Sequence, residues 1–92
     1  MAATRHWTVD IVIDEREDER ITQAEARLSA GDEQVSGRGT AYRHPDDVEV
    51  PRIGDELAAA RALSDLAHHL LDVASADVED VVARFRRATA GR

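Results

Sequence analysis

The chain has 92 residues, no cysteine and a formal net charge of −7, with 19 acidic residues against 12 basic ones, all of them arginine. A chain of this length forms one domain with a small core, and the lack of cysteine excludes disulfides and thiolate metal sites. The negative charge opposes non-specific attachment to nucleic acid or to an anionic membrane. No run approaches the ~20 apolar residues of a membrane span, and the first residues do not form a secretory signal, so we expect a cytoplasmic protein.

Three segments alternate between apolar and polar residues, which is the period of a β-strand. These segments are residues 6–14, 21–29 and 34–43. The acidic run 15–20 connects the first two, and a Gly-Asp turn connects the second to the third. The order predicts an antiparallel sheet of three strands.

Residues 53–71 carry apolar side chains at helical spacing, and Asp55 and Glu56 suit the positive N-terminal end of a helix. The apolar arc covers about half of the circumference, which is wider than the ~100° stripe of a surface helix. Two glycines of the third segment, Gly37 and Gly39, fall on its inward face, where glycine indicates that another element approaches closely. We therefore expect the alanines of this helix to pack against these glycines.

A second, short helix is predicted from Ser75 to about Arg87, behind a Ser or Asp cap. The fold class is then α+β, with two layers in the order β-β-β-α-α and the sheet covered on one face by the long helix. Residues 1–5 are expected to be a disordered N-terminus, 6–88 a single domain and 89–92 a frayed tail. Six residues are expected to share one core: Trp7, Val9, Ile11, Leu63, Leu66 and Leu70.

His68 and His69 form the one group that resembles a metal or catalytic site. Adjacent residues on a helix point about 100° apart, so the two imidazoles cannot chelate one ion. The simpler interpretation is a surface pair on the helix, either of His68 with Asp72 or of Asp65 with His69. The acidic run 14–19 lacks the spacing of a calcium loop, and no nucleophile is paired with a base. We therefore expect no catalytic residue, no metal and no cofactor.

Arg38, Tyr42 and Arg43 form the one outward-facing basic and aromatic patch. A solvated sheet face is the simpler interpretation. The patch is nevertheless the candidate partner-binding site, and it supports an alternative function as a nucleic-acid-binding module that uses the open sheet face.

Two stretches, "HWTVDIVIDE" (6–15) and "IGDELAAARALSDLA" (53–67), resemble a family of small, mostly actinobacterial proteins of unknown function. The similarity runs from about residue 6 to 79. The resemblance implies a fold like that of double-stranded-RNA-binding domains (dsRBD-like), a β-β-β-α core, an association with stress or dormancy, homodimers, and a likeness to ribosome hibernation promoting factors. It supplies no catalytic or binding residues.

Charge argues against duplex RNA as the partner. The long helix opens with Asp55 and Glu56, where true double-stranded-RNA-binding domains carry lysines, and RNA phosphates would be repelled there. The wide apolar arc, the apolar Val12 on the outward sheet face and the open sheet edges favour a homodimer. The expected function is that of a non-enzymatic stress- or dormancy-associated protein that acts as a homodimer, on the ribosome or on another protein.

Overall fold

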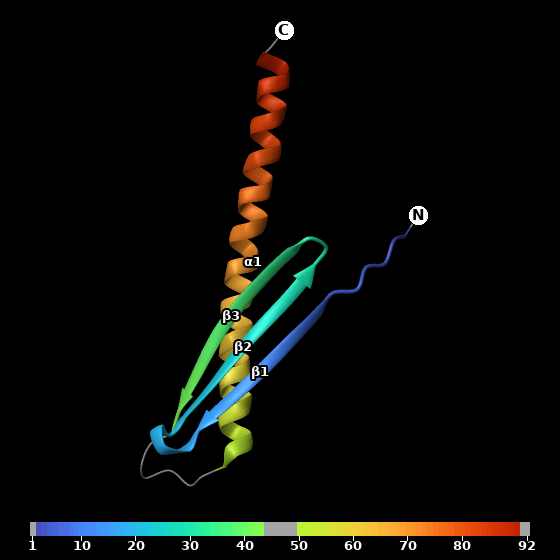
Figure 1. Cartoon of the computed structure of the whole chain (residues 1–92). Coiled ribbons are helices and arrows are strands. Elements are labelled where there is room, and N and C mark those ends of the chain that lie inside the picture. Colours follow the sequence, from blue (N-terminus) through green and yellow to red (C-terminus); the bar gives the residue numbers. More distant parts are fainter. Residues whose placement is uncertain (1, 44–49, 91–92) are drawn as a thin grey trace.

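The computed structural model describes residues 2–43 and 50–90. Three antiparallel strands are followed by one helix (Figure 1). The strands are β1 (Thr8–Arg16), β2 (Ile21–Ala30) and β3 (Glu33–Tyr42), a 3₁₀ turn η1 (Glu17–Glu19) lies between β1 and β2, and the helix is α1 (Pro51–Ala90). The predicted α+β class and the antiparallel three-stranded sheet are confirmed.

The sheet has the order β1-β2-β3, with β2 in the centre. Val9 lies opposite Leu28 and Ile11 opposite Ala26 in the register of β1 and β2, and Ala26 lies opposite Gly37 in β3. Directly opposed residues lie on the same face of a sheet. The apolar face of β1 is therefore continuous with the inward faces of β2 and β3.

The predicted break between a long helix and a short C-terminal helix is wrong, because α1 continues without interruption from Pro51 to Ala90. Ser75 has the side chain of a helix cap, but the residues around it include neither glycine nor proline, and alanine on both sides favours continuation of the helix. The helix begins with Pro51, whose fixed φ suits the first helical position. The expected frayed tail is helical as far as Ala90, and residues 91–92 lie outside the described part of the chain.

The helix crosses the inward face over β3 and β2 and has little contact with β1. Its C-terminal half extends past the end of the sheet (Figure 1), which makes the molecule 69 × 29 × 18 Å. None of the helical residues described forms a stretch long and apolar enough to cross a membrane.

The two inward glycines of β3 allow the backbones of strand and helix to approach each other closely, as the sequence predicts. A Cβ atom added at Gly37 would lie 2.2 Å from the backbone nitrogen of Leu66, and one at Gly39 would lie 2.3 Å from the backbone oxygen of Ala58. Alanine on the facing side of the helix leaves room for this approach. Alanine is the commonest residue of the core, which consists of Ala24, Ala26, Leu28, Val35, Ala41, Ala58, Ala62 and Leu66.

The predicted core needs correction. Leu66 is buried and Leu70 packs at the margin of the core, but Trp7 is 58% exposed and Leu63 is 41% exposed. Val9 and Ile11 are also exposed. The reason is the position of the helix, because α1 covers β2 and β3 and, within the described residues, has little contact with β1.

Candidate interaction surface

One flank of α1 covers the free edge of β3 with polar side chains. The Arg61 guanidinium donates to the backbone oxygen of Thr40 (2.7 Å), and the backbone N–H of Arg38 donates to the Asp65 carboxylate (2.8 Å). These bonds occupy backbone groups that an edge strand otherwise leaves unpaired. The β3 edge is therefore already occupied within the chain, whereas β1 is an edge strand beside an uncovered sheet face.

The histidine pair lies on the same helix and each ring has a separate partner. His69 Nδ1 donates to the backbone oxygen of Ser36 at 2.7 Å, and His69 Nε2 lies 3.7 Å from the Asp65 carboxylate. His68 Nδ1 lies 2.8 Å from the backbone oxygen of Ser64. The expected pair between positions 65 and 69 is thus present, and His69 adds a third side chain to the coverage of the β3 edge. Within residues 2–43 and 50–90, no group of three His, Cys, Asp or Glu side chains could hold a metal ion.

The structure does not gather the three residues of the predicted partner-binding patch into one site. Arg38 forms an ion pair with Glu25 on the outward sheet face (3.4 Å). Tyr42 is 75% exposed and lies four residues further along the strand, about 13 Å away in extended chain. Tyr42 and Arg43 both line a pocket at the end of the sheet, where the backbone N–H of Arg43 donates to the backbone oxygen of Arg20.

The outward sheet face carries mutually compensating charges. Glu25 forms hydrogen bonds and ion pairs with Arg27, its neighbour on β2, and with Arg38 across the strands. The hydrogen bond from Arg27 is the main reason why the pKa of Glu25 is lowered from its ordinary value of 4.5, and Arg38 adds to the effect. Because Glu25 neutralises part of the positive charge, this face offers less to an anionic ligand than the sequence suggests.

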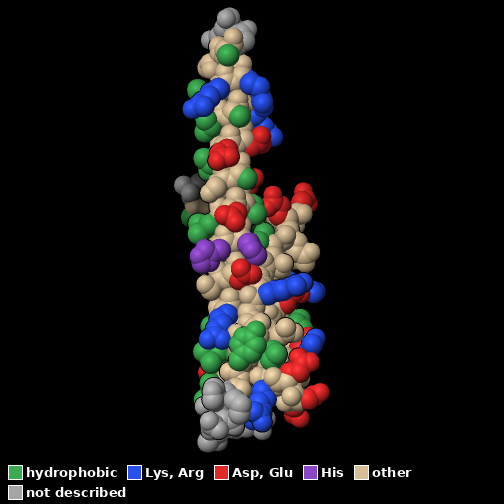
Figure 2. Space-filling view, turned by 90° about the vertical axis from the view of Figure 1, so that its left-hand side faces the viewer, with side chains coloured by type: hydrophobic (Ala, Val, Ile, Leu, Met, Phe, Trp, Pro, Cys, Tyr) green, Lys and Arg blue, Asp and Glu red, His purple; other side chains and the backbone are tan. Residues whose placement is uncertain are grey.

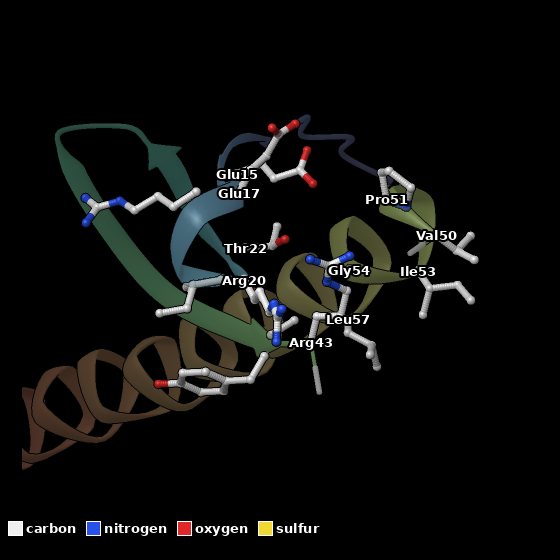
Figure 3. Close-up of a pocket in the computed structure, with 14 residues that line it drawn as sticks. Glu15, Glu17, Arg20, Thr22, Arg43, Val50, Pro51, Ile53, Gly54 and Leu57 are labelled. Carbon is white, nitrogen blue, oxygen red and sulfur yellow. The ribbon is translucent and has the colours of Figure 1, made fainter. Parts of the chain in front are cut away.

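The pocket that contains Arg43 lies between the end of the sheet and the first turns of α1 (Figure 3) and has a volume of about 390 Å³. Ile53 and Leu57 contribute to its apolar lining, Thr22 adds a hydroxyl, and Glu15, Glu17, Arg16, Arg20 and Arg43 supply charges of both signs. Mixed charges do not select a cation or an anion. The pocket therefore has no clear chemical preference for a ligand.

The most distinctive surface is apolar and is uncovered in the single chain. On β1, the side chains that share a face with the core remain exposed: Val9, Ile11 and Ile13 on the strand, with Trp7 just before it. On α1, exposed large apolar side chains continue to the C-terminal end, including Leu71 (65%) and Phe85 (69%). Figure 2 shows hydrophobic side chains distributed along the exposed helix beyond the sheet. Monomeric proteins rarely leave so much apolar surface exposed, and such surfaces are typical of protein–protein contacts.

Sequence reasoning missed the extent of this surface. The pattern of β1 indicated a buried face, and the wide apolar arc of the helix indicated a second contact. The sequence did not show that these two faces would both remain uncovered. The length of the uninterrupted helix would have been the signal, since no strand of the sheet is long enough to cover 40 helical residues.

These features define a small α+β protein whose three-stranded sheet supports an overlong helix with a free apolar face. Residues 5–87 match the family described as Rv2632c-like, and the chain belongs to this family. The chain is 51% identical over 77 residues to the uncharacterized protein MT1780 of Mycobacterium tuberculosis, a match that covers 84% of this chain and 80% of that protein. It is 52% identical over 71 residues to the uncharacterized protein Rv2632c of the same species, over 77% of this chain and 74% of that protein. The crystal structure of Rv2632c superposes with a TM-score of 0.78 at 42% identity, over 87% of this chain and 93% of that one.

Proposed function

We propose that this protein is a non-enzymatic interaction module that works as a homodimer. The observation that carries the proposal is the apolar surface of β1 and α1, which the single chain leaves exposed. Its burial would stabilise an association at roughly 25 cal/mol per Å² of apolar area, before the cost of association is subtracted. A small core made largely of alanine adds a reason, because a second copy would supply the apolar contacts that a domain of this size lacks.

Sedimentation equilibrium over about 1–100 μM tests the proposal, since a homodimer of moderate affinity populates within this range. We expect a species of twice the 10.1 kDa chain mass. Val78→Asp, which places a charge on the exposed apolar face of α1, should shift the protein to the monomer. Ala76→Asp is the matched control, because position 76 is exposed on a different side of the same helix. A wild-type protein that remains a monomer throughout this range contradicts the proposal.

A role in stress or dormancy, with the ribosome or another protein as partner, is supported by the family resemblance alone. The net charge of −7 favours contacts with protein surfaces over contacts with RNA phosphates. The dsRBD-like description rests on the order of three antiparallel strands and a long helix. Co-sedimentation with ribosomal fractions from stressed cells at low salt tests the ribosomal proposal, and absence from these fractions leaves a protein partner in its place.

Nucleic-acid binding by the open sheet face is the second candidate, and the high exposure of Arg38 and Tyr42 is the observation that favours it. With Arg38 in contact with phosphate, the affinity for a single-stranded oligonucleotide should fall with salt at a slope of about −0.7 on logarithmic axes. Arg38→Glu should abolish this binding. Unchanged binding in Arg38→Glu contradicts a role for this face.

A further inference from the structure

Ten positions of α1 follow one another at alternating spacings of four and three residues, which is the repeat of a coiled-coil seam. Nine of them are apolar, and all ten are exposed. They are Ile53, Leu57, Ala60, Ser64, Ala67, Leu71, Ala74, Val78, Val81 and Phe85. We call these ten positions the seam. A heptad pattern sustained over more than four repeats predicts contact with another helix along its whole length.

The seam lies on a different side of α1 from the residues that pack on the sheet. Ala58, Ala62 and Leu66 are the buried residues of the helix, and none of them belongs to the seam. At about 100° per residue, the middle of the seam lies roughly 160° around the helix from the buried stripe. The described residues therefore bury one face of α1 against the sheet, and the seam on the other face remains exposed.

We infer that two copies of this chain pack through their seams as an antiparallel helix pair, an inference that rests on the proposed homodimer and specifies its interface. The seam is self-complementary in this orientation, because a two-fold axis near position 69 places small residues beside larger ones in the inner layers, such as Ala67 beside Leu71. Five kinds of layer result, each occurring twice: Ile53 with Phe85, Leu57 with Val81, Ala60 with Val78, Ser64 with Ala74, and Ala67 with Leu71.

Layer composition favours the antiparallel orientation over the parallel one. A parallel pair would place each residue opposite its own copy, so that Ala60, Ser64, Ala67 and Ala74 would each form a layer of two small side chains. In the antiparallel pair only one kind of layer, Ser64 with Ala74, is small on both sides. Voids in an interface forfeit packing energy in the same way as voids in a core, so the antiparallel arrangement is better filled.

Charge is complementary at the two ends of the pair. Glu56 flanks the seam near one end and Arg84 flanks it near the other, so the two-fold axis brings Glu56 of one copy beside Arg84 of the second. Within one chain Arg84 pairs with Asp80 at 2.9 Å and remains 71% exposed in its side chain, which leaves it accessible to a second carboxylate. Flanking charges of this kind select the orientation of helix pairs.

Single-cysteine variants test this geometry, since the natural chain has no cysteine. Ser64→Cys and Ala74→Cys change small, exposed residues, and the two variants are oxidised alone and as a mixture. Positions 64 and 74 face each other in the antiparallel pair, whereas two copies of position 64 are about 15 Å apart along the axis, beyond the reach of a disulfide. We expect a covalent dimer in the mixture and in neither variant alone. A mixture of Ser29→Cys, on the outward sheet face, with Ala74→Cys is the control and should remain uncrosslinked.

The outcomes separate the interface from the proposed function, provided that each variant melts like the wild-type protein. Efficient crosslinking of either variant alone shows a parallel pair and overturns the inference. A dimer by sedimentation that yields no covalent species in the mixture places the interface elsewhere, which overturns the inference and leaves the homodimer intact. A wild-type monomer overturns both.

Discussion

Adding a single methyl group at Gly37 should destabilise the fold severely, because the added Cβ would meet backbone and not a side chain that can move aside. It would lie 2.2 Å from the backbone nitrogen of Leu66 and 2.5 Å from the backbone oxygen of Ala62, whereas ordinary van der Waals contact begins at 3.4 Å. The helix would have to retreat by more than about 1 Å, and the contacts of its buried residues with the sheet would loosen. Overpacking typically costs about 1–3 kcal/mol, and we expect the upper end of this range for Gly37→Ala.

Thermal unfolding followed by circular dichroism at a fixed protein concentration measures the effect. A loss of about 3 kcal/mol corresponds to a Tm lowered by about 12–24 °C in a domain of this size. Gly31→Ala is the matched control: it adds the same methyl group where no atom lies within 4 Å, and its cost of about 1 kcal/mol comes from the positive φ of 62°. A Gly37→Ala protein that melts no lower than the Gly31→Ala protein would refute the close approach of α1 to β3.

Three further predictions concern single side chains. Leu66→Ala should cost about 2–5 kcal/mol because Leu66 is the largest buried residue of the helix, and an unchanged denaturant midpoint would contradict this position in the core. Replacing His68 and His69 by Gln should cost about 1–3 kcal/mol, because two hydrogen bonds of about 0.5–1.5 kcal/mol each are lost. Zinc should not raise the Tm of the wild-type protein, and a zinc-dependent rise that the double variant lacks would show a metal site. Because the pKa of Glu25 is lowered, ionised Glu25 stabilises the fold at pH values above its ordinary pKa of 4.5, and this contribution is lost as the pH falls through the lowered pKa. Carboxyl NMR should show that the pKa of Glu25 rises in Arg27→Gln. An unchanged pKa would exclude Arg27 as the cause.

Local patterns predicted the sheet and its contact with the helix. Alternation located all three strands to within about two residues, and Gly37 and Gly39 correctly indicated where a neighbouring backbone approaches. The strands follow from the alternation of side chains close in sequence, and the close contact follows from glycine, whose missing side chain lets another backbone approach. The second helix was predicted wrongly because Ser75 and Asp77 carry a cap signal that the surrounding alanines and valines override.

The core and the candidate site depended on tertiary geometry that no local pattern contains. The face of β1 has the composition of a core, yet its burial depends on which strands the helix crosses, and α1 crosses β2 and β3. The patch of Arg38, Tyr42 and Arg43 was grouped by proximity in sequence. The structure separates it because Arg38 pairs with Glu25 while Arg43 lies at the end of the sheet.

Trp7 tests directly whether the apolar surface that the proposed homodimer buries includes β1. It is the one tryptophan of the chain and is 58% exposed in the single copy, just before β1. Its fluorescence and its quenching by acrylamide should therefore change with protein concentration. On dilution from about 100 μM to 0.1 μM, a range that spans the dissociation of a dimer of micromolar affinity, we expect the emission to shift to the red and quenching to increase. In Val78→Asp both should already have their diluted values at the highest concentration. Emission and quenching that are independent of concentration would contradict the burial of β1 in the homodimer.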